Sequence, residues 1–181
     1  MNRSLRSTAF LALVALPGVA MAHPGHGVGG GLVSGLLHPL TGADHLAAML
    51  LAGVWAGMMG SRAMWMLPFV LLGSMLAGFF TAALVPPAVA EGLIGATLGG
   101  LVLVALARLR PPLWLASAAV ALAGLGHGFA HGLEAPDGTA RAGFVIGFLA
   151  TAAVLQLAGL GLARFARQGL SLRRGTWHKA S

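Results

Sequence analysis

The chain has 181 residues, of which 57% are hydrophobic and only 8% are charged, and its mean hydropathy is +0.87. This composition is too apolar for a soluble domain of the same length and indicates an integral membrane protein. The net charge of +7 does not indicate nucleic-acid binding, because the basic residues lie in short loops and the tail, where membrane topology explains them. The sequence contains no cysteine, which excludes disulfides and thiolate metal sites and leaves His, Asp, Glu and Met as ligands.

Residues 1–22 have the pattern of a secretory signal peptide. Arg3 and Arg6 precede an apolar run, and the segment ends in the small-x-small tripeptide Ala20-Met21-Ala22. Cleavage after this tripeptide would leave the segment 23–30 on the outer side of the membrane. The alternative is a first helix that stays uncleaved.

The segment 23–30 begins His23-Pro24-Gly25-His26-Gly27, and its two imidazoles suit late first-row metals. Pro24 has no amide proton, so a chelate through the deprotonated amide nitrogen of the second residue is not available. We expect His23 and His26 to act as accessory ligands that collect metal outside the membrane. The alternative is a polar tail whose histidines are incidental.

Five apolar stretches follow, and most are near the length that crosses about 30 Å of hydrocarbon. They cover residues 31–59, 64–85, 88–107, 112–133 and 140–163. Only helices and closed barrels span lipid, and the alternation that barrel strands require is absent. The sequence therefore predicts an all-α integral membrane protein, with a bundle of about five transmembrane helices over 31–163 and a basic cytoplasmic tail over 164–181.

The first stretch is too long for one straight span and contains Pro39 and Gly42. We expect it to break near these residues, with a short re-entrant or interfacial helix up to Leu37 and the true span starting near Gly42. Broken helices at membrane depth are tolerated where they line a cavity, and transporters use the freed backbone groups as ligands.

Charge counting gives the orientation. With the mature N-terminus outside, one arginine, Arg141, falls outside, and the remaining basic loop and tail residues fall inside, as the positive-inside rule requires. These are Arg62, Arg108, Arg110, Arg164, Arg167, Arg173, Arg174 and Lys179. We therefore expect a multi-pass protein of the bacterial inner membrane with a periplasmic N-terminus and a cytoplasmic C-terminus. All four acids then lie toward the outer side: Asp44, Glu91, Glu134 and Asp137.

Glycine pairs four residues apart recur in the apolar stretches and favour close packing of helix backbones. They are Gly53 and Gly57, Gly95 and Gly99, Gly124 and Gly128, Gly128 and Gly132, and Gly143 and Gly147.

Two blocks carry the polar chemistry, His38-Pro39-Leu40-Thr41-Gly42-Ala43-Asp44-His45 and Gly126-His127-Gly128-Phe129-Ala130-His131-Gly132-Leu133-Glu134. In the second block the two histidines and the glutamate are spaced i, i+4 and i+7, so they project from one helix face. The topology brings both blocks to the outer half of the membrane. We therefore expect one shared metal site, whose predicted ligands are His38, Asp44, His45, His127, His131 and Glu134.

Glu91 begins the third span on the same side and is a further accessory candidate. A lone intramembrane histidine can instead be a helix-to-helix hydrogen-bonding residue. Imidazole and carboxylate ligands without thiolate suit Ni, Co, Zn or Cu(II), whereas Ca and Mg require oxygen-rich shells. Ionisable residues inside a membrane are expensive and mark ion or proton sites by default.

Together with the signal peptide and the His23-Pro24-Gly25-His26-Gly27 start, the two blocks resemble the HupE/UreJ family. The resemblance covers essentially the whole mature chain. It implies a small membrane protein associated with hydrogenase and urease and acting as a permease for nickel or cobalt, with the six block residues as the family-motif residues. It implies no prosthetic group and no enzymatic activity, and it suggests hydrogenase or urease maturation proteins as partners.

Two other functions fit the sequence. One is a membrane-bound metal-binding or assembly module that delivers metal without transporting it. The other is an intramembrane hydrolase, because Ser34-Gly35 resembles part of a serine-protease signature, although Leu32 occupies the place of its first glycine. No His-Glu-x-x-His metalloprotease motif is present in the sequence.

Overall fold

The structure is a computed structural model that describes residues 31–177, with side chains described over 31–168. All regular elements in this part of the chain are helices. They are α2 (Leu32–Thr41), α3 (Ala43–Met59), α4 (Ala63–Thr81), the short 3₁₀ helix η1 (Ala82–Leu84), α5 (Pro87–Leu106), α6 (Leu113–Glu134) and α7 (Ala140–Trp177). The all-α prediction is confirmed. The predicted signal peptide and the segment 23–30, with His23 and His26, lie outside the described residues.

Four helical segments are long and apolar enough to cross a membrane, Ala63–Leu84, Pro87–Leu106, Leu113–Glu134 and Ala140–Gln168. Helix α3 has 17 residues, which is about 25 Å of helix at 1.5 Å per residue. This length is close to the hydrocarbon thickness of about 30 Å, so α3 fits as a fifth span. Large apolar side chains cover the outer surface of the bundle, as expected where helices face lipid, and include Phe69, Phe80, Trp114 and Phe165. The chain is therefore a multi-pass membrane protein.

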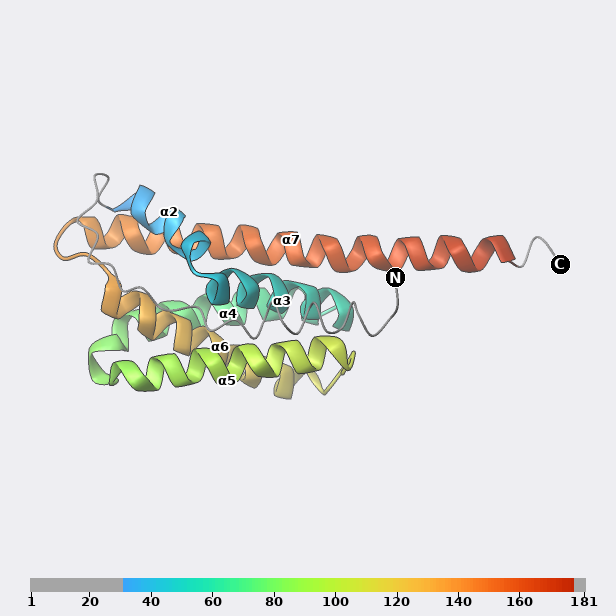
Figure 1. Cartoon of the computed structure of the whole chain (residues 1–181), viewed down its shortest axis with the longest axis horizontal. Coiled ribbons are helices and arrows are strands. Elements are labelled where there is room, and N and C mark those ends of the chain that lie inside the picture. Colours follow the sequence, from blue (N-terminus) through green and yellow to red (C-terminus); the bar gives the residue numbers. More distant parts are fainter. Residues whose placement is uncertain (1–30, 178–181) are drawn as a thin grey trace.

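Successive long helices run in alternating directions, as Figure 1 shows. Helices α3, α5 and α7 run one way and α4 and α6 run the other, while α2 lies along the start of α7 and in the same direction. The end of the bundle that holds α2, the end of α6 and the start of α7 is called here the histidine end. The opposite end, which holds the α3–α4 turn and the α5–α6 loop, is called the far end.

The first apolar stretch is broken, as predicted, and the break lies at Gly42. This glycine has an extended backbone, with φ −99° and ψ 119°, between the last residue of α2 and the first of α3. Pro39 lies inside α2, so that helix extends to Thr41 and is longer than the expected helix up to Leu37. A proline removes only its own amide donor. The Thr41 hydroxyl then donates to the carbonyl oxygen of His38 at 2.8 Å and supports the last turn.

Glycines hold α4 and α6, α2 and α7, and α3 and α7 at backbone contact. A Cβ placed on Gly128 of α6 would overlap the Met75 carbonyl oxygen of α4, and one placed on Gly147 of α7 would overlap the Leu32 carbonyl oxygen of α2. Four of the five predicted glycine pairs lie at such contacts. The fifth pair, Gly95 and Gly99 on α5, has no atom within 4 Å of a Cβ added at either position. Spacing therefore identified a small-residue face on α5 that no other described helix covers.

Polar contacts close the far end of the bundle. Gly60 ends α3 with φ 78°, a left-handed conformation that glycine adopts without strain. The buried Trp55 donates its Nε1–H to the Leu109 carbonyl oxygen at 3.0 Å, and Arg167 donates Nη1–H to the Gly57 carbonyl oxygen at 3.1 Å. Helix α7 continues past residue 163 to Trp177, so most of the predicted tail is a continuation of the last helix.

Candidate metal centre

Helix α6 supplies two completely buried imidazoles, His127 and His131. The His127 Nδ1–H donates to the Ala123 carbonyl oxygen, one turn earlier, at 2.8 Å. Because a carbonyl can only accept, the neutral ring then carries its lone pair on Nε2. That Nε2 is buried without a hydrogen-bond partner, as are both ring nitrogens of His131. Each of the two neutral rings therefore offers one buried nitrogen with a free lone pair, of the kind that binds a metal.

The start of α3 supplies a third imidazole in the same chemical form. His45 donates its Nδ1–H to Asp44 Oδ1 at 3.0 Å, and its backbone N–H donates to the same oxygen at 2.9 Å. A carboxylate on one ring nitrogen fixes the tautomer and raises the basicity of the other, an arrangement typical of metal-ligating histidines. The free nitrogen, His45 Nε2, is buried and has no partner. Asp44 thus acts through His45.

His38 of α2 joins the two blocks directly. Its Nε2–H donates to Glu134 Oε2 at 2.8 Å, from the end of α2 to the end of α6. The two side chains are 27% and 49% exposed, far more than the buried rings of α6. This pair therefore forms the accessible edge of the site.

The four imidazoles form a single group, which is called here the histidine cluster: His38, His45, His127 and His131. Ring centroids are 4.9 Å apart for His45 and His127, for His45 and His131, and for His38 and His131. His38 and His45 are 6.3 Å apart. His131 therefore contacts residues on both sides of the break at Gly42, and blocks about ninety residues apart in the sequence meet at one point.

The donor atoms lie near the spacing that an ion requires. One donor atom each from His38, His131 and Glu134 lies within 4.8 Å of the other two. A tetrahedral ion with bonds of about 2.0–2.1 Å holds its ligands about 3.3 Å apart. Small side-chain rotations would therefore bring these groups into one coordination shell.

Glu91, the other accessory candidate, is not in this group. It is exposed on α5 and makes no hydrogen bond or ion pair with any other residue in the described part of the chain. Its position one turn from the start of α5 puts it at the histidine end, as expected from the topology. The depth of Glu91 in the membrane could be predicted from its position in the sequence. The rotation of α5, which turns this side chain outward, could not.

Aromatic side chains that sequence reasoning did not single out enclose the cluster. The Phe148 ring stacks on His131 with centroids 4.6 Å apart and an interplanar angle of 22°. Phe144 lies 5.3 Å from the His38 ring, and Phe79 lies 5.5 Å from Phe148. The i, i+4 spacing of Phe144 and Phe148 was the available signal. These rings fix His131 and separate it from water and lipid.

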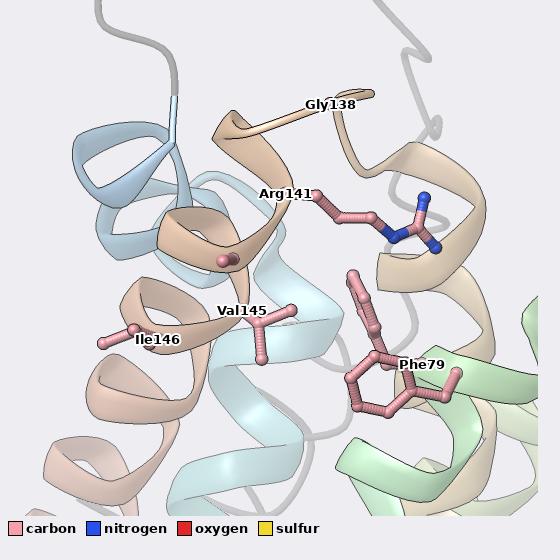
Figure 2. A pocket seen from close by; sticks show the side chains of 7 residues that line it. Phe79, Gly138, Arg141, Val145 and Ile146 are labelled. Atoms are coloured by element: carbon pink, nitrogen blue, oxygen red, sulfur yellow. The ribbon is translucent and has the colours of Figure 1, made fainter.

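An apolar pocket of about 430 Å³ lies beside this aromatic wall, between the end of α4 and the start of α7 (Figure 2). The Arg141 guanidinium lies over the Phe79 ring, 4.8 Å from its centroid, at the rim of the pocket. A fixed positive charge repels a metal dication. The side of the cluster with exposed Glu134 and His38 is therefore the more favourable approach for a cation.

Fold and site together define a multi-pass helical membrane protein with a buried imidazole and carboxylate cluster near one end of its bundle. Residues 11–177 match the HupE / UreJ protein family, and the chain belongs to that family. Among curated proteins, "Protein HupE" of Rhizobium leguminosarum bv. viciae is 38% identical over 173 residues, which cover 92% of this chain and 88% of the relative. No solved structure matches the chain.

Proposed function

We propose that this protein is a secondary-type uptake permease that carries nickel, or cobalt, across the bacterial inner membrane for hydrogenase or urease maturation. The single observation that carries the proposal is the histidine cluster, in which three rings present buried nitrogens without partners. Such nitrogens are expensive to bury unless something binds them. Membership in the HupE/UreJ family supports the same conclusion. We assign the protein no catalytic activity.

The proposed ligands are those of the two blocks. The unpartnered nitrogens of His45, His127 and His131 would bind the ion first, and His38 and Glu134 would exchange their mutual hydrogen bond for the metal. Asp44 would hold His45 in the required tautomer. Imidazole and carboxylate suit nickel and cobalt, and copper would bind still more tightly by affinity alone, so geometry and supply must provide selectivity.

The orientation we propose puts the histidine end at the periplasmic face and the C-terminus in the cytoplasm. Its support is the charge distribution. Arg62 lies in the α3–α4 turn, and Arg108 and Arg110 lie in the α5–α6 loop, all at the far end. The positive-inside rule assigns that end to the cytoplasm. A cleaved signal peptide over 1–22 would leave His23 and His26 outside, where they would collect scarce metal.

Transport in this scheme is not driven by nucleotide hydrolysis, and the sequence has no nucleotide-binding motif. A membrane potential of about 100 mV, negative inside, contributes about 4.6 kcal/mol to the inward movement of a dication. The ligands must lose protons to bind metal, so protons are natural counter-ions at this site. The break at Gly42 lets the first block offer ligands from two helices, His38 from α2 and His45 from α3.

The direct test is nickel uptake by purified protein in sealed liposomes with an imposed potential, negative inside. The proposal expects nickel to accumulate in the lumen, and His131→Ala liposomes to behave like protein-free ones. Binding to the protein without lumenal accumulation would instead establish the metal-delivery function. For the hydrolase alternative, Ser34 is exposed on α2, and we expect the Ser34→Ala variant to transport normally.

A further inference from the structure

Gln156 is a buried amide in the middle of an apolar span. It lies on α7 and is only 1% exposed, and neither its Oε1 nor its Nε2 has a hydrogen-bond partner. The surrounding span, Ala140–Gln168, is among the most apolar of the chain. Burying an amide without partners costs about 1–3 kcal/mol in proteins and more in a purely apolar medium. A leucine would pack there without this cost, so the amide needs an explanation other than packing.

The position of Gln156 relative to the histidine cluster follows from the packing of α3 against α7. A Cβ on Gly53 of α3 would overlap the Gln156 carbonyl oxygen, so these two residues lie at the same level. The two helices run in the same direction, and Gly53 follows His45 by two turns. At 1.5 Å per residue, Gln156 lies about 12 Å from the level of His45, toward the far end.

Gln156 also lies on the helix faces that lead away from the cluster. On α7 it continues the i, i+4 series that begins with Phe148, the residue stacked on His131. On α3 the corresponding series begins with His45, passes through the buried Met49 and reaches Gly53. Both series start at the histidine cluster and end at the contact between Gly53 and Gln156.

The buried side-chain nitrogens and oxygens without partners are few in the described part of the chain, and their positions are not random. Three of the residues that carry them belong to the histidine cluster, and the other two are Gln156 and Ser117. Ser117 precedes His127 on α6 by almost three turns, again toward the far end. Every such atom is therefore at the cluster or on its far-end side.

We propose that Gln156 is a second, weaker ligand for the metal dication, which its amide oxygen receives after the ion leaves the histidine cluster. This inference rests on the proposed permease function. Transport requires sites that bind strongly enough to admit an ion and weakly enough to release it. Four imidazoles alone would retain nickel, whereas a neutral amide oxygen is a poorer ligand for a late first-row metal. Met49 lies between the two positions and offers a thioether on the way.

The test compares Gln156→Leu with the wild type in two measurements on the full chain. The equilibrium affinity of the variant for nickel in detergent should stay within about twofold of the wild-type value, because the histidine cluster is intact. The rate of lumenal accumulation in liposomes at saturating nickel should fall about tenfold. Gln156→Asn keeps an amide and should restore most of the rate. The matched control is Ser74→Ala, which removes a partly buried hydroxyl that is already bonded to the Val70 and Leu71 carbonyl oxygens. Its rate should be unchanged.

A wild-type rate in Gln156→Leu overturns the role of Gln156 and leaves the permease function intact. Lack of accumulation by the wild type overturns the permease function, and the Gln156 role with it. If Gln156→Leu does not fold, Gln156→Ala, which removes the amide without adding bulk, takes its place with the same expected loss of rate. A fall in affinity equal to the fall in rate would identify Gln156 as structural and also overturn the inference.

Discussion

The two halves of the candidate metal centre differ in how deeply they are buried. The α6 half, His127 and His131, is completely buried, and its neighbouring glycines press α6 against α4 at backbone contact. The α2–α3 half lies on both sides of the break at Gly42, and its side chains remain 27% exposed at His38 and 14% at His45. One half is therefore built into the core of the bundle, and the other is partly open at its edge.

This difference indicates how the site could bind an ion and let it go. Donor atoms within 4.8 Å of one another must still move inward to bind one ion. Backbone contacts fix both α6, against α4, and α2, against α7, so the movement must come from side chains. Helix α2 is attached to α7 by the Thr151 hydroxyl, which donates to the Leu36 carbonyl oxygen at 2.8 Å, and by glycine contacts. The side chains of His38 and Glu134 are the most exposed of the site and have the most room to close on an ion.

The largest effect is expected from His131→Ala, because this ring contacts His38 and His45 as well as Phe148. Nickel uptake by cells should fall to background while the protein remains in the membrane, as measured by radioactive nickel accumulation and immunoblotting of membranes. His178→Ala, a histidine near the C-terminus of the sequence, is the matched control and should keep wild-type uptake. Substantial uptake by His131→Ala would show that the site does not require His131.

Gly128→Ala tests whether backbone contact holds the α6 half in place. The added methyl group would overlap the Met75 carbonyl oxygen, and overpacking of this kind typically costs about 1–3 kcal/mol. We expect a lower thermal unfolding midpoint and weaker nickel binding. Gly95→Ala on α5 adds the same group where no atom lies within 4 Å. Equal destabilisation by both substitutions would contradict the packing argument.

Asp44→Asn tests the carboxylate that orients His45 in the α2–α3 half. The amide keeps the size of the side chain and loses the charge, so nickel affinity should fall about 10–100-fold, as is typical for partners of metal-ligating histidines. Isothermal titration of purified protein measures this directly. An unchanged affinity would mean that the pairing between Asp44 and His45 has no part in metal binding. Asp44→Ala should abolish uptake at limiting metal.

A smaller effect is expected for Glu134→Gln, at the exposed edge of the site. The substitution removes one charge that attracts the dication and weakens the hydrogen bond to His38. The half-saturating nickel concentration should rise a few-fold, with little change in the maximal rate, and the difference should shrink at high salt, since exposed charges are screened within about 8 Å at physiological ionic strength. A loss of maximal rate alone would assign Glu134 to a later step.

The smallest effect is expected for the double variant His23→Ala and His26→Ala. A collecting role predicts lower uptake only when nickel is scarce, because at high concentration the cluster fills without help. Uptake measured over a range of nickel concentrations tests this prediction. Loss of uptake at saturating nickel would contradict it.

Much of the architecture could be predicted because composition and charge constrain a membrane protein strongly. The helices α4 to α6 begin and end within a few residues of the predicted stretches, since each needs about 20 apolar residues. The proximity of the two blocks followed from alternating spans, which bring the start of the first and the end of the fourth to one side. The break near Pro39 and Gly42 was predicted from these two residues, and the structure places it at Gly42.

The details that depend on helix rotation and on neighbours could not be predicted. Spacing places Gly95 and Gly99 on one face, but only the packed bundle reveals that no described helix covers it. Glu91 has the predicted depth and faces outward. The stacking of Phe148 on His131 and the choice of free nitrogen on each ring depend on contacts between helices that are far apart in the sequence.

The central claim is that both blocks hold one ion. Equilibrium nickel binding tests it most directly, in a background where His23 and His26 are alanine, for the otherwise unchanged chain and for His45→Ala and His131→Ala. We predict that the background chain binds one nickel ion. We predict that each variant binds none at the nickel concentrations that saturate the background chain. Two ions per chain, of which one is retained at full affinity in each variant, would contradict a shared site.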